Sequence, residues 1–522
     1  TNSGANMSSY NNLVISGSNV KTLALATTVT GTTTVNTGCT LATGAFTLTN
    51  SGTANINGSF RLDQGGWGGS TGTYNYGTTG TLVFNNTIGT YNVNSADTWW
   101  PTTNGPVNVT VQGGGGIIMN VARTVPSSGT SGTFLLVTGT NAIQGTALTL
   151  NGNVQINGGN FQTTPTYGGS STLIYNTTYG TFNEWTGGAS GSVSAGSGVP
   201  ANVQVLTGTL TLAGGRGVPG NVTVTAGGLT LNATSGDLYI GGNLTNNGTW
   251  TNNSRAVRFV GTGTSVVTAS SGTQFFDYLL IEKTSGSVQI ASATNVTINT
   301  TSGSVLQLLN AGTLDLNGRT LTLNNSGGNI LVDGTSGGTT KSIVSTSGTG
   351  TIAITNNKTA SGNASGTLST SSSVNWILTG GMNFWGVTTV NGTLQLNSGG
   401  FVTTNAPTYG TGSLLKYNSG ANPFNRTTEW SASSGNGYPY NVQLSNNTTM
   451  SPGGSSNTGT ALNVANNLTI DSGSSIHMDY GGNNMTVPLI VNNDLNLNGN
   501  LSGSGASGGD IVVKGNWNRT GS

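Results

Sequence analysis

Three acidic residues recur beside tryptophans, and they are the groups in this sequence best placed to do chemistry: Asp97 with Trp99 and Trp100, Glu184 with Trp185, and Glu429 with Trp430. A pair of carboxyl groups can cleave glycosidic bonds when the two lie roughly 5 to 10 Å apart. In a fold of stacked coils, with about 20 residues and about 4.8 Å for each coil, even Asp97 and Glu184 are roughly four coils, or roughly 20 Å, apart. The acids therefore cannot form one catalytic pair, and their recurrence predicts equivalent loop positions.

The tryptophans beside these acids are the second candidate group. Trp99, Trp100, Trp185 and Trp430 all fall in segments of variable length and not in regular strands. Exposed indole rings would offer an apolar face to a sugar or to a partner protein. Alternatively, each ring packs its loop against the body of the fold. We therefore treat these four residues as the possible contacts for a glycan or a partner, and expect no catalytic, cofactor-binding or metal-binding residue.

Other reactive groups occur singly. His477, between Asp471 and Asp479, is the only histidine, which excludes a multi-histidine zinc centre and leaves a surface turn as the simplest expectation. Cys39 is the only cysteine and is expected to be a small buried apolar group. The glycines from 113 to 116 lack the Lys and Ser or Thr of a phosphate loop and predict a turn. The closest charged groups are expected to be isolated exposed pairs: Arg255 with Arg258, and Glu282 with Lys283.

Composition excludes several classes of protein. The 522 residues include only 14 basic and 13 acidic ones, with a net charge of +1, so no electrostatic footprint for nucleic acid or anionic membranes is present. No apolar run approaches the roughly 20 residues of a membrane helix. The N-terminus has no signal region, which predicts a mature product or an excised segment. Val, Ile, Thr, Tyr and Trp in regular alternation argue against disorder.

The pattern of strands predicts the fold class. Short runs of residues alternate with period two between Gly, Asn and Ser, and nothing has helical periodicity. Strand starts recur at Asn202, Asn221 and Asn243, which implies a coil of about 20 residues. We expect an all-β, elongated, right-handed parallel β-helix (a β-solenoid) with about 20 residues per rung, about 26 rungs and surface loops.

Two levels of repetition organise the chain. A Tyr-Gly box returns at Tyr76, Tyr167 and Tyr409, and each copy reaches a strand residue, Asn85, Asn176 or Asn418, nine positions later. A larger unit of roughly 270 residues repeats as well, because Asp237 returns as Asp510 and Tyr10 as Phe276. Residues 1–522 are therefore expected to be one continuous β-solenoid with about two copies of this unit, as a segment of a longer protein.

Several boxes together resemble a known class of proteins. They are Pro407 to Gly410 with Glu429, Trp430 and Gly437 to Pro439, then Asp237 to Asn247, then Leu314 to Leu323. They resemble the long repetitive surface proteins that Bacteroidota export by type IX secretion. The resemblance implies an extracellular, cell-surface β-solenoid, often within a very large adhesin-like protein, and implies the type IX secretion machinery as a partner.

The expected function is that of a non-catalytic structural shaft in a large cell-surface adhesin or fibre. Three alternatives stay open: a carbohydrate-binding adhesin with exposed loop tryptophans, a self-assembling filament subunit, and a polysaccharide-processing β-helix enzyme. The low charge weakens repulsion between copies, so self-association is a further expectation, as is contact with surface glycans or other cells. Nucleic acid and membrane insertion are not expected.

Overall fold

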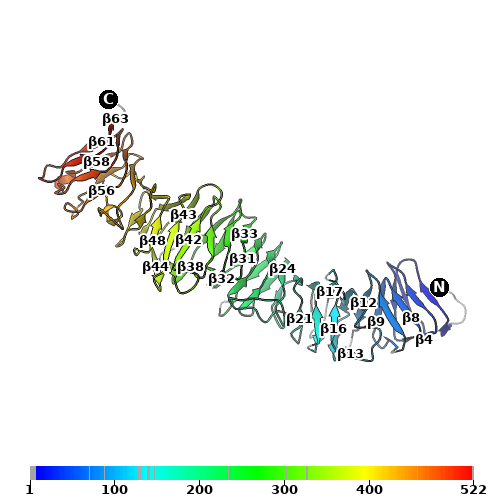
Figure 1. Ribbon diagram of the computed structural model, residues 1–522. Coiled ribbons are helices and arrows are strands. Elements are labelled where there is room, and N and C mark those ends of the chain that lie inside the picture. The colour runs from blue at the N-terminus through cyan, green and yellow to red at the C-terminus, as the bar shows by residue number, and fades with distance from the viewer. Residues whose placement is uncertain are drawn as a thin grey trace. The chain divides into compact units, whose positions relative to one another are not determined.

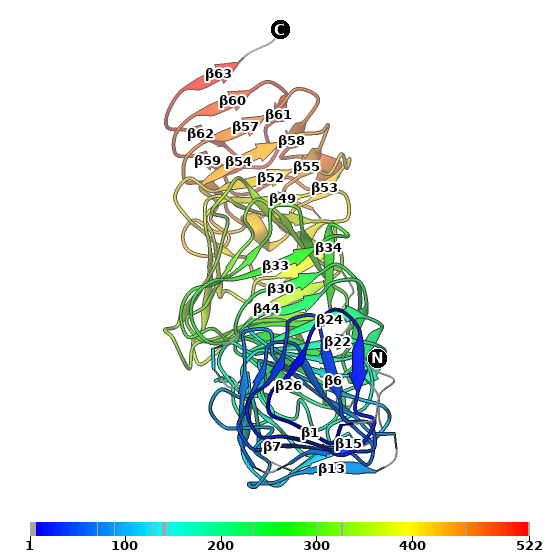
Figure 2. The ribbon, with the colours of Figure 1, turned by 90° about the vertical axis from the view of Figure 1, so that its right-hand side faces the viewer.

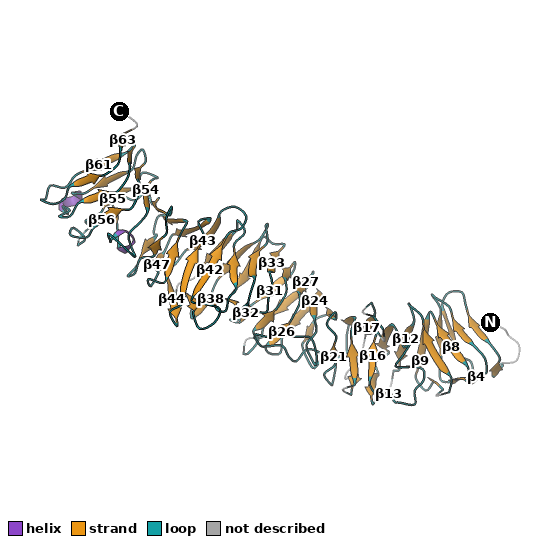
Figure 3. Ribbon diagram, in the orientation of Figure 1, coloured by secondary structure: helices purple, strands orange, loops and turns teal. Residues whose placement is uncertain are grey.

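The protein is an all-β parallel β-solenoid of about 22 turns, with about 23 residues per turn. The computed structural model describes residues 7–519 except 70, 88, 127, 130, 138–141, 146, 233, 301, 325, 326 and 455. Over these residues the structure consists of strands and loops with no α-helix, and two short 3-10 helices, η1 (Thr428–Trp430) and η2 (Tyr480–Gly482), lie in the C-terminal part (Figure 3). The prediction of an all-β parallel solenoid is confirmed.

The coils are longer, and therefore fewer, than the spacing of strand starts in the sequence predicts. Strand spacing varies because loops of different length separate equivalent strands. Trp376 pairs with Leu394 across a short coil, whereas Leu321 pairs with Ile352 across a much longer one. Asn202, Asn221 and Asn243, on which the predicted coil length rests, lie in a stretch with short coils. The prediction from these three residues is therefore shorter than the average of about 23 residues per turn.

Contacts within the chain divide it into two compact units, residues 1–253 and 254–522. The boundary falls inside the segment 236–281, where the larger sequence repeat begins again. A single continuous body over residues 1–522 stays a prediction.

One long parallel ladder runs through the first unit (Figure 1). Its strands are β3 (Val20–Thr22), β6 (Thr40–Ala42), β9 (Ser59–Asp63), β12 (Thr81–Asn85), β14 (Asn108–Gln112), β17 (Thr133–Leu136), β20 (Asn153–Ile156), β22 (Thr172–Asn176), β24 (Asn202–Thr207), β27 (Val222–Val224) and β30 (Leu244–Asn246).

Shorter parallel ladders form the other faces of the first unit. They comprise β1 (Ser9–Tyr10), β4 (Thr27–Val29), β7 (Thr47–Asn50) and β10 (Trp67–Gly68); β2 (Leu13–Ile15), β5 (Thr33–Val35), β8 (Thr53–Ile56) and β11 (Thr73–Tyr76); β13 (Thr90–Val93), β15 (Gly116–Met119) and β18 (Ile143–Gln144); β16 (Arg123–Val125), β19 (Leu148–Leu150) and β21 (Thr166–Tyr167); β23 (Tyr179–Gly180), β25 (Thr209–Thr211), β28 (Gly228–Thr230) and β31 (Thr249–Thr251); and β26 (Arg216–Val218) with β29 (Leu238–Ile240).

The second unit has an 11-stranded parallel sheet, whose C-terminal strands lie one above another in Figure 2. Its strands are β34 (Thr273–Phe276), β37 (Asn295–Ile298), β40 (Thr320–Leu323), β43 (Gly350–Ile354), β46 (Val374–Leu378), β49 (Thr393–Leu396), β52 (Leu414–Tyr417), β54 (Asn441–Leu444), β57 (Leu468–Ile470), β60 (Leu495–Leu497) and β63 (Trp517–Arg519).

The remaining strands form the other faces of the second unit. They are β32 (Ala256–Phe259), β35 (Tyr278–Ile281), β38 (Ser304–Leu308), β41 (Asn329–Asp333), β44 (Lys358–Asn363), β47 (Gly381–Asn383) and β50 (Phe401–Val402); β33 (Ser265–Ala269), β36 (Ser287–Ile290), β39 (Thr313–Asp315), β42 (Thr340–Val344), β45 (Thr367–Thr370), β48 (Thr388–Val390) and β51 (Thr408–Tyr409); β53 (Phe424–Asn425), β55 (Thr449–Ser451), β58 (Ser475–His477) and β61 (Asn500–Ser502); and β56 (Leu462–Val464), β59 (Leu489–Val491) and β62 (Ile511–Val513).

The core of each unit consists of apolar side chains stacked along the ladders. Val154, Leu173 and Val203 are successive register partners, and all three are buried. Intervening residues on these strands face outward, which explains the period-two alternation in the sequence. Because each buried Val or Leu contributes about 1.5–3 kcal/mol, a coil is stable only with neighbours covering its core on both sides.

Asparagines at strand starts connect neighbouring coils. The side-chain Oδ1 of Asn202 accepts a hydrogen bond from the backbone N–H of Asn221 at 2.9 Å, and Asn221 accepts from Asn243 at 2.8 Å. In the second unit, Asp494 Oδ1 accepts in the same manner from the N–H of Asn516 at 2.8 Å. These side-chain oxygens form a ladder along the coils and satisfy N–H groups that lie beyond the regular sheet hydrogen bonds.

Replacing Asn221 tests this ladder. Asn221→Ala should lower the free energy of unfolding by about 1 kcal/mol, because the N–H of Asn243 loses its acceptor. Asn221→Asp keeps an oxygen at the same place and should cost less. Urea denaturation of the two variants measures the difference, and equal stabilities would contradict a structural role for the side-chain oxygen.

Candidate functional site

Three clusters of aromatic and acidic side chains form around the Tyr-Gly boxes. The first cluster is Tyr76, Phe84, Trp99 and Trp100; the second is Tyr167, Tyr175, Glu184 and Trp185; the third is Tyr409, Tyr417, Glu429 and Trp430. In each, the box tyrosine donates a hydrogen bond to the carbonyl oxygen of the residue just before the last tryptophan. The distances are 2.7 Å from Tyr76 to Trp99, 2.8 Å from Tyr167 to Glu184, and 2.9 Å from Tyr409 to Glu429. This shared bond shows which residues are equivalent.

In the second cluster, the buried Glu184 carboxylate is surrounded by hydrogen-bond donors. The hydroxyl of Tyr175 donates to Oε1 at 2.8 Å, and that of Tyr179 lies 3.4 Å from Oε2. The backbone N–H of Phe182 donates to both oxygens, at 3.0 and 3.1 Å. The carboxylate therefore holds its loop against strand β22, where Tyr175 lies.

The third cluster repeats this arrangement in the second unit. Tyr417 donates to Oε1 of the buried Glu429 at 3.1 Å, and the N–H of Thr427 donates to both carboxylate oxygens at 3.1 and 3.0 Å. The buried Arg426 donates to the carbonyls of Pro452 at 2.7 Å and Thr460 at 2.8 Å. Both charged side chains therefore organise loops around the coil.

The first cluster has an apolar pair in place of the glutamate and tyrosine. Trp99 occupies the position of Glu184 and Glu429, and Phe84 occupies that of Tyr175 and Tyr417; the two rings pack edge to face at 5.8 Å. The predicted equivalence of Asp97 with the two glutamates was therefore wrong, because Asp97 lies two residues earlier in the loop. Its carboxylate accepts a hydrogen bond from the N–H of Asn94 at 2.6 Å.

The four tryptophans proposed as contacts are all buried. Trp99 is 2% exposed, while Trp100, Trp185 and Trp430 have no exposed surface. The indole N–H of Trp185 donates to Gly217 at 3.1 Å, and that of Trp430 to Asn463 at 2.8 Å. A ring enclosed in this way has no free face for a sugar to stack on, so the structure favours the alternative in which these rings pack their loops against the solenoid.

Burial changes the proton affinity of the two glutamates. It raises the pKa of Glu184 above the ordinary value near 4.5, although the hydrogen bonds from Phe182 and Tyr175 act in the opposite direction. Burial likewise raises the pKa of Glu429, opposed by the hydrogen bonds from Thr427 and Tyr417. Taking a carboxylate out of water disfavours its charged form.

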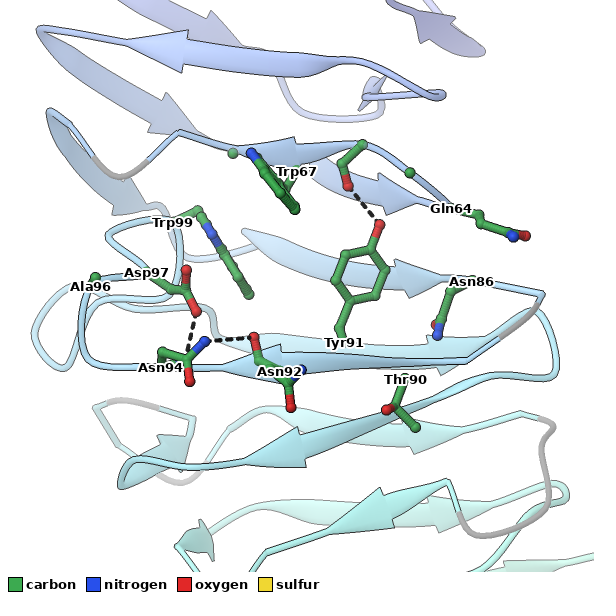
Figure 4. A pocket seen from close by; sticks show the side chains of 13 residues that line it. Gln64, Trp67, Asn86, Thr90, Tyr91, Asn92, Asn94, Ala96, Asp97 and Trp99 are labelled. Carbon is green, nitrogen blue, oxygen red and sulfur yellow. Dashed lines mark hydrogen bonds between the residues drawn. The ribbon is translucent and has the colours of Figure 1, made fainter.

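An open cavity of about 540 Å³ lies beside the first cluster (Figure 4). Trp67 and Tyr91 project into it, the edge of the buried Trp99 forms part of its wall, and Asp97 with several side-chain amides completes the lining. Trp67 is 57% exposed, in contrast to the four buried tryptophans. The cavity therefore combines an accessible indole with neutral hydrogen-bonding groups and a carboxylate.

Hydrogen bonds and close packing fix the side chains that line the cavity. The hydroxyl of Tyr91 donates to the backbone carbonyls of Asp63 and Gly66, the latter at 2.6 Å. Burial, and secondarily Asp63, raise the pKa of Tyr91 to about 12, so the hydroxyl remains a donor at neutral pH. Gly68 allows Trp99 to approach closely, since a Cβ at this position would lie 2.9 Å from the indole Cδ1.

An insertion in the sequence explains why the cavity lies beside the first cluster. The segment from Tyr91 to Trp100 is longer than the corresponding Gly-Thr-aromatic-Asn segment from Phe182 to Trp185. The longer segment carries Asn92, Asn94, Ala96 and Asp97, all of which line the cavity. The extra residues therefore supply one wall.

Trp67 was missed by the sequence analysis although a signal was present. A Gly-Gly pair is followed directly by an aromatic residue before two of the Tyr-Gly boxes, at Trp67 and Phe401, and by Asn160 before the other. Phe401 is 37% exposed and Trp67 is 57% exposed, whereas Phe161 takes the next, inward-facing position, which corresponds to Gly68. Comparing the three segments would have identified the position, but only the structure shows its exposure.

The single reactive residues occupy different environments. Cys39 is buried and unbonded to another cysteine, as predicted, with Sγ 2.6 Å from the carbonyl oxygen of Gly17. His477 Nδ1 lies 3.1 Å from Ser502 Oγ, while Asp471 accepts a hydrogen bond from Gln443 and Asp479 is exposed. Gly113 to Gly115 connect strand β14 to strand β15, as expected for a turn, whereas Gly116 is the first residue of strand β15.

The expectation of isolated exposed charges at residues 282 and 283 was wrong. Both side chains are buried. Glu282 Oε1 lies 2.5 Å from Nη1 of Arg258 on the preceding coil, and Lys283 Nζ donates to the carbonyl of Val260 at 3.1 Å. Burial lowers the pKa of Lys283. These groups therefore connect neighbouring coils. The sequence did not show this, because each partner lies about one turn earlier in the chain.

No group of three His, Cys, Asp or Glu side chains in the described part of the chain could hold a metal ion. Among the same residues, no helix is long and apolar enough to cross a membrane. Comparisons with protein-family models, curated proteins and solved structures found no match.

The hydrogen bond between Tyr175 and Glu184 can be tested directly. Tyr175→Phe should lower the free energy of unfolding by about 1–3 kcal/mol, because a buried carboxylate loses a donor. Tyr179→Phe is the matched control in the same cluster, and its longer contact predicts a smaller loss. Denaturant unfolding compares them, and a larger loss for Tyr179→Phe would overturn the assigned roles.

The raised pKa values of the two glutamates predict a pH dependence. Their native states bind protons more tightly than the unfolded chain, so their contribution to stability is fully present below about pH 4 and falls as pH rises through the native pKa values. The double variant Glu184→Gln with Glu429→Gln keeps the shape but cannot ionise. The stability of the wild type relative to this variant should therefore decrease as the pH rises from about 4. Urea denaturation at a series of increasing pH values measures this difference, and a constant or increasing difference would contradict the prediction.

Proposed function

We propose that this chain is a non-catalytic structural shaft of an extracellular, cell-surface adhesin or fibre. The observation that carries the proposal is the uninterrupted stacking of parallel strands within each unit. In the second unit, 11 strands form a single sheet, in which neighbouring strands come from successive coils and are hydrogen-bonded to each other. Such a stack resists deformation because many backbone hydrogen bonds must break before a coil detaches.

The interior adds to this mechanical role. Ile352, Trp376 and Leu394 are register partners on successive coils and are fully buried. Peeling off one coil exposes the apolar face of the next, so each step costs hydrophobic as well as hydrogen-bonding free energy. The third cluster strengthens the outer loops, since Arg426 and Glu429 hold segments that the regular sheets do not reach.

The location outside the cell rests on the resemblance to Bacteroidota surface proteins exported by type IX secretion. The low charge is compatible with a crowded, glycan-rich exterior. Under this proposal the type IX machinery is the export partner, and the chain acts as a spacer that holds other parts of the protein away from the cell.

Optical-tweezers measurements on the full-length chain, held by handles at both ends, test the mechanical role. Each detached coil should release about 23 residues, or about 80 Å of extended chain. We expect stepwise lengthening in increments of this size under sustained force. Unfolding at the lowest resolvable force would contradict the role of a shaft.

The location has its own test. Antibodies raised against the chain should label intact cells of the source organism without permeabilisation. Labelling that requires permeabilised cells would contradict the extracellular part of the proposal and would leave the mechanical measurement unaffected.

A further inference from the structure

We propose that the cavity beside the first cluster binds a neutral carbohydrate, with the exposed indole of Trp67 as the stacking platform. The cavity lies wholly within the first unit, and its volume of about 540 Å³ is within the range of small-molecule sites, roughly 300–1,000 Å³. This binding role goes beyond that of a structural shaft and does not depend on it.

The first argument is the exposure of Trp67. Large aromatic side chains contribute most of the apolar surface at binding sites, and leaving an indole in water forgoes that stabilisation. At the equivalent position before the third Tyr-Gly box, Phe401 is 37% exposed, whereas Trp67 is 57% exposed. Trp67 faces the cavity (Figure 4).

The second argument is the mixture of groups around the ring. The C–H groups of a pyranose pack on an aromatic face, and its hydroxyls need both donors and acceptors at the edge. Gln64, Asn92 and Asn94 supply amides, and Asp97 supplies a carboxylate that accepts from paired hydroxyls. An apolar ligand would displace water from these polar groups without replacing the hydrogen bonds that the water made.

The charges select a neutral sugar. No Lys or Arg side chain is among the described residues that line the cavity, so the lining would present the carboxylate of Asp97 and no cation to an anionic sugar or a phosphate. Arg123 lines a neighbouring hollow, where it donates to the carbonyls of Trp100 at 2.5 Å and Asn94 at 3.3 Å. Its role there is to support the inserted loop.

The third argument is the rigidity of the cavity wall. Tyr91 is held by two backbone carbonyls, Trp99 packs against Gly68, and Asp97 is oriented by the N–H of Asn94. A site formed before the ligand arrives loses little conformational entropy on binding. The residues inserted between Tyr91 and Trp100 therefore form an ordered wall of the cavity.

The test uses the full-length chain on an array of neutral and anionic oligosaccharides, followed by calorimetric titration of the best neutral ligand. Trp67→Ala should weaken binding by about tenfold or more, because the stacking surface is lost. Trp385→Ala is the matched control: this tryptophan is 58% exposed but lies in the second unit. It should leave affinity unchanged within about twofold.

A second variant separates stacking from hydrogen bonding. Asp97→Asn keeps an oxygen for the N–H of Asn94 and removes the charge, and should weaken binding by severalfold with the fold intact by circular dichroism. Failure of every neutral oligosaccharide to bind, equal affinity of Trp67→Ala and wild type, or preference for anionic sugars would each overturn the proposal. None of these outcomes alters the mechanical measurement of the shaft.

Discussion

In-register parallel stacking is the constraint on which the rest of this structure depends. Strands pair with the strands one coil before and one coil after them, so the side chain at an inward position must rest on its equivalents in both neighbours. Val154, Leu173 and Val203 illustrate the consequence: three residues from separate coils share one column of the core. A coil has no core of its own, and its stability is that of the contacts with its neighbours.

Where coils differ in length, the longer coil carries an inserted loop. The backbone N–H and C=O groups of such a loop have no hydrogen-bond partners in the sheets and need other partners. In the second and third clusters, a buried glutamate at the base of the loop accepts hydrogen bonds from backbone N–H and tyrosine hydroxyl groups. The cost of burying the carboxylate is seen in the raised pKa values of Glu184 and Glu429, whose hydrogen bonds offset it only in part.

The first cluster has neither the buried glutamate nor the tyrosine that donates to it. Glutamate and tyrosine are exchanged together for Trp99 and Phe84, so that neither a carboxylate nor a hydroxyl is buried without its partner. The box tyrosine and its bond to the backbone are retained. With the same attachment and a longer insertion, the first copy borders an open cavity, one wall of which consists of inserted residues.

The sequence by itself determined the fold class, the buried cysteine and the recurrence of the three Tyr-Gly boxes, because strand alternation and turn residues are local properties that stacking repeats. It did not determine the average turn of about 23 residues, since loops of unequal length separate the strands. It also misassigned Asp97 and the environment of Glu282 and Lys283. Only the tertiary structure decided that Trp99, Trp100, Trp185 and Trp430 are buried while Trp67 is exposed. The physical reason is that exposure depends on which residues of other coils cover a ring, and those residues lie a full turn away in the sequence.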